Sequence, residues 1–244
     1  MTSRVAVLYA PGTNCHEETI AAIEHAGGRA ELVLLKELMA AETRLMDYGA
    51  AIIPGGFSYG DHLGAGRIFG RMLVARLGEQ LSQFLDAHRP VLGICNGFQV
   101  LAEAGILPQV RLGRQAMALL ANQSARFEDR KVRLLVTSEP SIWTEGLAGE
   151  VLHMPSAHGE GRVFFPQNQS PPPRVAFRFA DPNGTSTSAY PDNPNGSPEA
   201  IAGVVDATGL VLGLMPHPER ASLPAHYSQD GLKIFRNLVR WLAD

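Results

Sequence analysis

The stretch that most constrains this chain covers residues 90–104. Val91–Ile94 is an apolar run typical of a short buried strand, and the apolar run after Cys95 is typical of a helix. Between them, Gly93-Ile-Cys-Asn-Gly97 has the form of a nucleophile elbow with Cys in place of Ser. The two glycines avoid clashes where strand, turn and helix crowd together. The pattern predicts a thiol presented on a sharp turn; a buried Cys beside an ordinary tight turn is the alternative.

Strands and helices alternate along the first part of the chain. Nearly continuous apolar runs, as in residues 4–10, are typical of parallel strands buried on both faces. Their succession with helical stretches predicts a parallel sheet covered by helices on both faces, with ligands at the carboxyl ends of the strands. We expect strands at residues 4–10, 31–35, 50–53 and 91–94, helices at 17–26 and 67–87, and a weakly helical connection at 38–46.

The pattern changes after about residue 107. Alternating stretches there predict an antiparallel addition to the sheet. We expect strands over residues 124–137, over 151–165 with a loop at 156–161 inside, and over 175–179. We also expect a hairpin of 201–205 with 210–215, loops at 167–173 and 181–198, and a last helix at 231–242 capped by Asp230. No convincing linker interrupts the chain. The expected fold is therefore a single α/β domain over residues 1–244. It is a three-layer open, mostly parallel sheet with helices on both faces and an antiparallel β addition.

Composition excludes several classes of function. The net charge is −3 and the 21 basic residues form no run, which argues against binding to nucleic acid or an anionic membrane. We expect no secretory segment at the start and find no apolar run of about 18 residues that could cross a bilayer. Two cysteines, Cys15 and Cys95, then indicate free thiols and a cytoplasmic location. No lysine follows a glycine-rich loop, so the sequence contains no P-loop for ATP.

A second chemical motif is Met215-Pro-His-Pro-Glu-Arg220, which follows an expected strand. Each proline restricts the residue before it to an extended backbone, and residues two apart in an extended chain face the same side. Glu219 could then orient His217 and stabilise its protonated form, as the third member of a catalytic triad does. A proline-rich turn with a surface His and Glu is the alternative. Together with the Cys elbow, the motif predicts a Cys95–His217–Glu219 triad.

Other residues are weaker candidates for the site. Gly55 and Gly56 follow a buried strand, where backbone N–H groups can approach a ligand closely, although an ordinary βα turn would also explain them. His158 lies in a glycine-rich stretch, where contact with a ligand or partner and a structural role are both open. Cys15 also lies in a strand-end loop but lacks the elbow. No Cys/His cluster has the spacing of a zinc site, so we expect no metal.

Read as a whole, the sequence resembles the glutaminase (amidotransferase) components of phosphoribosylformylglycinamidine synthases, which are triad-type glutamine amidotransferases. The resemblance extends over nearly the whole chain. It differs at Thr13 and His16, where the family pattern has Ser and Asp. The motifs that carry it are Pro11-Gly-Thr-Asn-Cys15, Pro54-Gly-Gly-Phe-Ser-Tyr-Gly-Asp61, Gly93-Ile-Cys-Asn-Gly-Phe-Gln99, Ala157-His-Gly-Glu-Gly-Arg162, Asn193-Pro-Asn-Gly-Ser197 and Met215-Pro-His-Pro-Glu-Arg220.

The resemblance implies a flavodoxin-like class I amidotransferase fold and hydrolysis of L-glutamine to glutamate and ammonia. Cys95 would attack the side-chain amide, His217 would transfer protons and Glu219 would orient His217. The family pattern suggests the backbone N–H groups of Gly56 and Asn96 as the oxyanion hole. It suggests a substrate-binding group of Gly55, Phe57, Gln99 and Phe127.

The resemblance also implies partners. A synthetase subunit, often with a small third subunit, would use the ammonia for ATP-dependent conversion of formylglycinamide ribonucleotide to formylglycinamidine ribonucleotide. This chain would need no cofactor of its own, because ATP and Mg²⁺ would bind the synthetase. Two other classes stay open: a stand-alone Cys-elbow hydrolase or peptidase of the related superfold, and a non-catalytic regulatory subunit that kept the fold.

Overall fold

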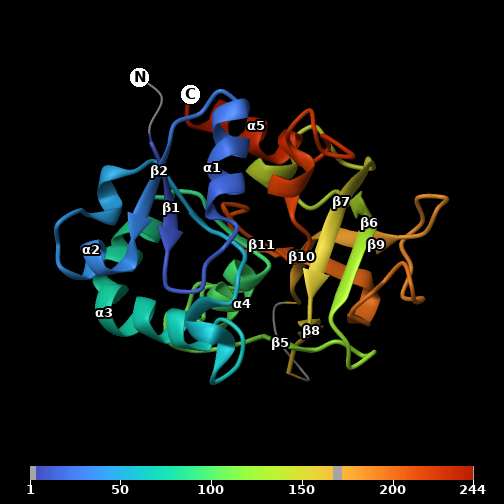
Figure 1. Cartoon of the computed structure of the whole chain (residues 1–244), viewed down its shortest axis with the longest axis horizontal. Helices are drawn as coiled ribbons and strands as arrows, with labels where there is room; N and C mark the ends of the chain where they lie inside the picture. Colours follow the sequence, from blue (N-terminus) through green and yellow to red (C-terminus); the bar gives the residue numbers. More distant parts are fainter. Residues whose placement is uncertain (1–3, 167–171, 244) are drawn as a thin grey trace.

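A nine-stranded sheet forms the centre of the computed structural model, which describes residues 4–166 and 172–243. The strand order is β2-β1-β3-β4-β11-β10-β9-β6-β7 (Figure 1). The first five strands of this order are parallel, and three of them, β3, β4 and β11, have every residue buried. These five are β2 (Ala30–Leu34), β1 (Val5–Tyr9), β3 (Ala50–Ile53), β4 (Val91–Ile94) and β11 (Val211–Leu214).

The remaining four strands are antiparallel and continue the same sheet. β10 pairs with β11 as the expected hairpin, so hydrogen bonds run without interruption from one half of the molecule to the other. The antiparallel strands are β10 (Ile201–Val205), β9 (Arg174–Ala180), β6 (Glu128–Val136) and β7 (Val151–His158). A separate two-stranded ribbon joins β5 (Ala118–Ala121) to β8 (Glu160–Phe164).

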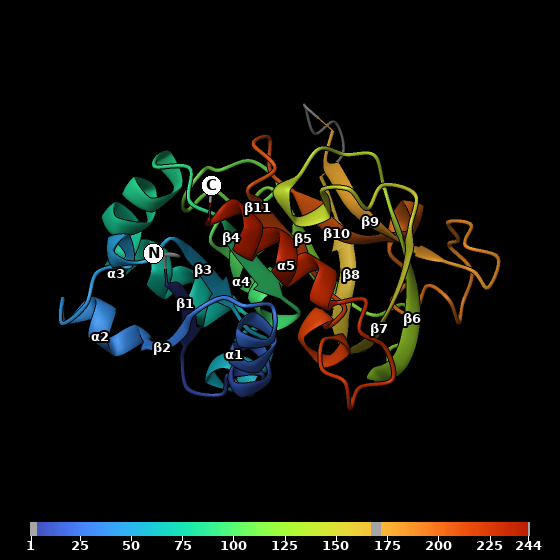
Figure 2. The same ribbon diagram turned by 90° about the horizontal axis from the view of Figure 1, so that it is seen from above.

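Helices cover both faces of the parallel half. α1 (His16–His25) and α5 (Leu232–Trp241) pack together on one face, while α3 (Arg67–Asp86) and α4 (Asn96–Glu103) pack together on the other (Figure 2). A short helix, α2 (Leu35–Met39), follows β2. Single 3₁₀ turns cover Leu45–Asp47, Ser58–Asp61, Ile142–Thr144, Pro198–Ala200 and Pro218–Ala221. The predicted three-layer α/β architecture with an antiparallel addition is confirmed.

Several local predictions are wrong. The loop expected at residues 156–161 is instead the end of β7 and the start of β8, with Gly159 alone between the strands. β6 begins at Glu128 rather than 124, because residues 122–127 form a turn held by Asn122. Asp230 does not cap α5; its carboxylate accepts a hydrogen bond from the backbone N–H of His153 at 2.9 Å.

Two further points concern the extent of the elements. The weakly helical stretch expected at 38–46 is shorter, because α2 ends at Met39, and β5 was not predicted at all. Most of the loop expected at 167–173 lies outside the described residues. Within the parts of the chain that are described, no helix is both long and apolar enough to cross a membrane.

Candidate active site

Cys95 lies on a strained turn between β4 and α4. Its φ of 51° and ψ of −105° are unusual for a residue with a side chain, and α4 begins at the next residue. The flanking glycines make the turn possible. A Cβ on Gly97 would lie 1.9 Å from the carbonyl oxygen of Ile53, and one on Gly93 would lie 2.5 Å from that of Gly97. The expected strand–turn–helix geometry is therefore present, and Cys95 as a whole is only 6% exposed.

His217 and Glu219 form a buried pair just after β11. The imidazole Nδ1 and the carboxylate Oε1 are 2.6 Å apart, and the backbone N–H of His217 donates to the carbonyl of Pro155 at 2.7 Å. His217 has the expected extended backbone, with φ of −104° and ψ of 90°. Glu219 does not, because it lies in the 3₁₀ turn Pro218–Ala221, although the expected contact between the two side chains is present. Burial opposes a charge on the imidazole, but Glu219 and the Cys95 sulfur outweigh it and raise the pKa of His217 well above its ordinary value.

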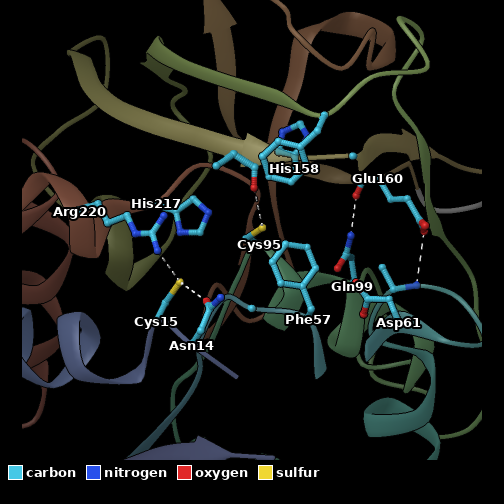
Figure 3. Close-up of a pocket in the computed structure, with 15 residues that line it drawn as sticks. Asn14, Cys15, Phe57, Asp61, Cys95, Gln99, His158, Glu160, His217 and Arg220 are labelled. Atoms are coloured by element: carbon cyan, nitrogen blue, oxygen red, sulfur yellow. Dashed lines mark hydrogen bonds between the residues drawn. The ribbon is translucent and has the colours of Figure 1, made fainter. Parts of the chain in front are cut away.

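A cavity of about 200 Å³ connects these groups at the carboxyl ends of the strands. This volume suits a ligand of amino-acid size better than a larger molecule, since drug-sized sites typically span about 300–1,000 Å³. Cys95, His217 and Gln99 all line it, and Figure 3 shows them around one opening. The Cys95 thiol points toward the carbonyl of Ala157 at 3.6 Å, from the end of β7. Both halves of the sheet therefore contribute to the cavity wall.

Gly56 lines the same cavity as Cys95, and Asn96 is the residue that follows Cys95. In the part of the chain that the structure describes, neither backbone N–H donates to a protein acceptor. Gly56 has a φ of +149°, and an added Cβ would lie 2.6 Å from the carbonyl oxygen of Gly12. Only glycine can therefore bring this N–H group to the cavity. Two available N–H groups near a nucleophile are the minimum of an oxyanion hole.

Gln99 is buried and its amide group has protein partners. Its Nε2 donates to the carbonyl of Glu160 at 2.6 Å, and its Oε1 accepts from the Asn96 side chain at 2.9 Å. Asn96 Nδ2 also lies 3.4 Å from Asp61, and Glu160 accepts from the backbone N–H of Ala65 at 3.4 Å. Gln99 and Asn96 therefore fix one wall of the cavity, which Asp61 and Glu160 also line (Figure 3).

The other predicted substrate contacts differ in character. Phe57 and Phe127 are half-exposed, and their ring centroids lie 6.4 Å apart, so together they form one side of the cavity. Gly55 is buried beneath the imidazole, where an added Cβ would lie 2.8 Å from Cε1 of His217. Gly55 therefore makes room for His217 rather than lining the cavity.

His158 is buried in a complete hydrogen-bond network. Its Nε2 lies 2.9 Å from the Ser156 hydroxyl and its Nδ1 lies 3.1 Å from Oδ1 of Asn122. Burial, helped by the nearby charge of His217, lowers the pKa of His158 to about 4, so the ring is neutral at pH 7. Although His158 touches the cavity, these contacts favour a structural role: the ring holds the end of β7, which carries Ala157, against Cys95.

The structure also brings in residues that the motif analysis did not place in the site. Arg220 Nη2 lies 3.2 Å from the sulfur of Cys15, and both residues line the cavity. Cys15, His217 and Glu219 each offer a ligand atom within 4.8 Å of the others. Burial raises the pKa of the Cys15 thiol, against a hydrogen bond to His217 that lowers it. No local spacing could reveal this cluster, because Cys15 lies about two hundred positions before His217 and Glu219.

Comparisons with known proteins agree with this geometry. Residues 2–242 match the family described as a CobB/CobQ-like glutamine amidotransferase domain. The chain is 43% identical to phosphoribosylformylglycinamidine synthase subunit PurQ of Pyrococcus furiosus, over 98% of both chains. It is 39% identical to the PurQ subunit of Dehalococcoides mccartyi, over 96% of both chains.

Solved structures give the same result. A chain in the structure of PurLQS from Thermotoga maritima has 33% identity and a TM-score of 0.81, with 99% of this chain and 100% of that chain covered. A glutamine amidotransferase from Thermotoga maritima, at 16% identity, covers 100% of this chain and 99% of its own with a TM-score of 0.61, and shows a common fold alone. The chain therefore belongs to the CobB/CobQ-like glutamine amidotransferase domain family.

Proposed function

We propose that this chain is the glutaminase subunit of phosphoribosylformylglycinamidine synthase. The observation that carries the proposal is the buried His217–Glu219 pair, 2.6 Å apart, beside a cysteine on a strained elbow at one cavity. The full-length similarity to PurQ subunits supports the choice of reaction. The subunit hydrolyses L-glutamine to glutamate and ammonia. A synthetase subunit then uses the ammonia to convert formylglycinamide ribonucleotide to formylglycinamidine ribonucleotide with ATP.

In the first half-reaction the Cys95 sulfur attacks the side-chain carbonyl carbon of glutamine. The C–N bond breaks as protonated His217 gives its proton to the leaving ammonia, and a glutamyl thioester remains. His217 then removes a proton from water, which attacks the thioester and releases glutamate. Glu219 holds one imidazole tautomer and stabilises the protonated ring, in keeping with the raised pKa of His217.

The negative oxygen of each tetrahedral intermediate lies between the N–H groups of Gly56 and Asn96. Loss of one such donor typically costs about 2.7–4 kcal/mol in the transition state. Glutamine also carries an ammonium group, and the carboxylates of Asp61 and Glu160, which line the cavity, are suited to receive it. Burial and the charge of Glu160 raise the pKa of Asp61, and a bound cation would relieve that cost. Phe57 and Phe127 cover the aliphatic part of the substrate.

The partners follow from the same proposal. The chain acts with a synthetase subunit and a small third subunit in the cytoplasm. The similar Thermotoga maritima chain belongs to a structure named PurLQS, which supports this assembly. We propose that this chain holds no cofactor and that ATP and Mg²⁺ bind the synthetase. The chain forms one amidotransferase domain over its whole length.

Coupled assays test the function. Glutamate release and formylglycinamidine ribonucleotide formation are measured together with purified synthetase, using wild type and Cys95→Ala. We expect the variant to lose glutamine-dependent product while added ammonia still supports synthesis. Glutamine-dependent product from Cys95→Ala would show that Cys95 is not the nucleophile.

Labelling with an electrophilic glutamine analogue separates the two thiols near His217. We expect the label on Cys95 rather than Cys15, because Cys95 lies on the strained elbow and the next residue, Asn96, supplies one of the two available N–H groups. Cys15→Ala serves as the matched control and keeps the label. A chain that takes no label but binds the synthetase would favour a regulatory subunit instead.

A further inference from the structure

We propose that Asn195 is a positioning residue for substrate binding. It holds the backbone of Gly161 and thereby fixes the direction in which the carboxylate of Glu160 enters the cavity. The inference rests on the proposed function, in which Glu160 helps to receive the ammonium group of glutamine. The described lining of the cavity includes Glu160 but not Asn195, so Asn195 acts through its neighbours. It belongs to the motif at residues 193–197, one of those that carry the family resemblance.

The strand that carries Glu160 is irregular at Gly161. In the ribbon of β5 with β8, Leu120 pairs with Arg162, whereas the next residue of β5, Ala121, pairs with Glu160. The register therefore shifts, and Gly161 is the extra residue of a β-bulge. A bulge leaves its extra residue outside the regular ladder and re-aims the side chains beside it. The backbone groups of Gly161 consequently depend on other partners.

The bulge separates Glu160 from the next side chains of its strand. Alternate residues of a regular strand share one face, so Glu160 would point in the same direction as Arg162 and Phe164. In the protein, Arg162 and Phe164 line a different hollow of the surface. Glu160 lines the active-site cavity, where its carboxylate accepts a hydrogen bond from the backbone N–H of Ala65 at 3.4 Å (Figure 3). The backbone at Gly161 therefore determines that a carboxylate faces the substrate.

Two asparagine side chains hold Gly161 from both sides. Nδ2 of Asn195 donates to the carbonyl oxygen of Gly161 at 2.9 Å, and the N–H of Gly161 donates to Oδ1 of Asn122 at 3.1 Å. Both asparagines are at most 3% exposed. Buried backbone groups require such partners, and losing one leaves a costly unpaired group. The two amides therefore stabilise the bulge in the shape that aims Glu160 at the cavity.

Asn195 is itself held in one orientation. Its Oδ1 accepts a hydrogen bond from the backbone N–H of Ser197 at 2.9 Å, and its backbone carbonyl accepts from the N–H of Gln123 at 3.0 Å. The hydroxyl of Ser197 in turn accepts from the backbone N–H of Val163 at 3.0 Å. The loop and β8 are thus joined at two nearby points, so a change at Asn195 is transmitted to the bulge.

Kinetics with two substrates tests this role. The substrates are glutamine and glutaramate, which has hydrogen in place of the α-amino group, and release of glutamate or glutarate is measured with synthetase present. Glu160→Gln should raise KM for glutamine by about 10–100-fold, the usual effect of losing a hydrogen bond to a charged group. Asn195→Ala should raise it by about 2–10-fold, the usual effect of one neutral hydrogen bond. Both variants should keep kcat for glutamine and both constants for glutaramate.

The double variant Glu160→Gln/Asn195→Ala shows whether Asn195 acts through Glu160. If it does, KM for glutamine in the double variant equals that of Glu160→Gln alone, because the carboxylate that Asn195 positions is already gone. Independent structural effects would instead add. Additive changes in KM, or equal losses of kcat/KM for glutamine and glutaramate in Asn195→Ala, would therefore overturn the proposal.

Folding is controlled with circular dichroism and with two further variants. Asn195→Asp keeps the shape and the acceptor for Ser197 but loses the donor to Gly161, so it should raise KM for glutamine as Asn195→Ala does. Asn183→Ala removes an exposed asparagine and should leave both substrates unchanged. An unchanged KM in folded Asn195→Asp would also contradict the role of Asn195. Failure of the wild-type complex to hydrolyse glutamine would instead contradict the proposed function.

Discussion

Glu219 is the residue on which the charge state of the proposed base depends. Its carboxylate is fully buried and lies 2.6 Å from His217, whose pKa it raises. Glu219→Gln keeps the shape but removes the charge, so protonated His217 loses its stabilisation. We expect kcat/KM for glutamine to fall by about 10²–10⁴-fold, the usual size of a general acid–base contribution. Steady-state glutamate release with synthetase present measures it.

The pH profile separates this role from simple misfolding. The part of the pH–rate profile that reflects the titration of His217 should move to lower pH in Glu219→Gln, because the pKa of His217 falls when the carboxylate charge is gone. The exposed carboxylate of Glu17 provides the matched control, and Glu17→Gln should leave both rate and profile unchanged. A full rate in folded Glu219→Gln would remove Glu219 from the proposed triad.

His158 should make the stability of the protein depend on pH. Its pKa falls from 6.5 to about 4 on folding, so the unfolded chain binds more protons between these values. Stability is therefore fully present above pH 6.5 and is lost as the pH falls toward 4. For this group alone the loss at pH 5 is about 2 kcal/mol. Urea unfolding at pH 7 and pH 5 measures the difference.

The comparison variant is His158→Gln, which cannot titrate. It should be less stable than wild type at pH 7, since its side chain cannot reproduce both contacts to Ser156 and Asn122. The difference in the free energy of unfolding between the two proteins should be smaller at pH 5, where wild type loses the stability that the neutral imidazole provides. Equal slopes against pH in the two proteins would show that His158 does not titrate in this range.

At the scale of elements, the contact of β3 with α4 depends on one missing side chain. A Cβ on Gly97 would lie 1.9 Å from the carbonyl oxygen of Ile53, so Gly97→Ala must push the helix away from the strand. We expect a loss of about 1–3 kcal/mol or more in the free energy of unfolding. Gly78, in α3, is the matched control, because nothing lies within 4 Å of an added Cβ.

Gly78→Ala should stabilise the protein by about 0.5–1 kcal/mol, since glycine inside a helix is unfavourable relative to alanine. Denaturant unfolding of both variants compares the two effects. Similar stability for Gly97→Ala and wild type would mean that strand and helix can separate without cost, against the tight packing at the elbow.

The elements that could be predicted are those whose pattern is local. The β4 strand, its turn and α4 follow from consecutive residues, and so does the hairpin of β10 with β11. The end of β7 was mistaken for a loop because glycines flank it, whereas pairing with β6 across residues 128–135 makes it a strand. Tertiary pairing thus overrode the local preference.

The active site, too, contains contacts that could be predicted from the local sequence and contacts that could not. His217 and Glu219 are two positions apart, so their contact could be predicted even though the backbone between them is a 3₁₀ turn. Asp61, at the end of a 3₁₀ turn, and Glu160, at the start of β8, approach one cavity although they are 99 positions apart. Cys15 meets His217 from the opposite end of the chain. Nothing in the local sequence encodes these meetings; they follow from the order of strands in the sheet.

At the scale of the whole molecule, the cavity lies where the parallel and antiparallel halves meet. Cys95 follows β4, His217 follows β11, and Ala157 lies in β7 of the antiparallel half. The backbone N–H of His217 donates to Pro155 of β7, which ties the proposed base directly to that half. The geometry of the site therefore requires both halves to be folded at once.

This dependence predicts that the chain unfolds as one unit. β10 and β11 hydrogen-bond across the boundary, and the buried hydrophobic core of the described residues forms one continuous cluster rather than two. Two tryptophans report on different regions: Trp143 donates to the carbonyl of Leu210, while Trp241 lies in a hollow with Met46 and Tyr48. Trp143→Phe and Trp241→Phe each leave one reporter. In each variant, fluorescence and far-ultraviolet circular dichroism should give the same midpoint in urea. Separate midpoints for the two signals would instead divide the chain into two domains, and the cavity would then lose its shape before the more stable domain unfolds.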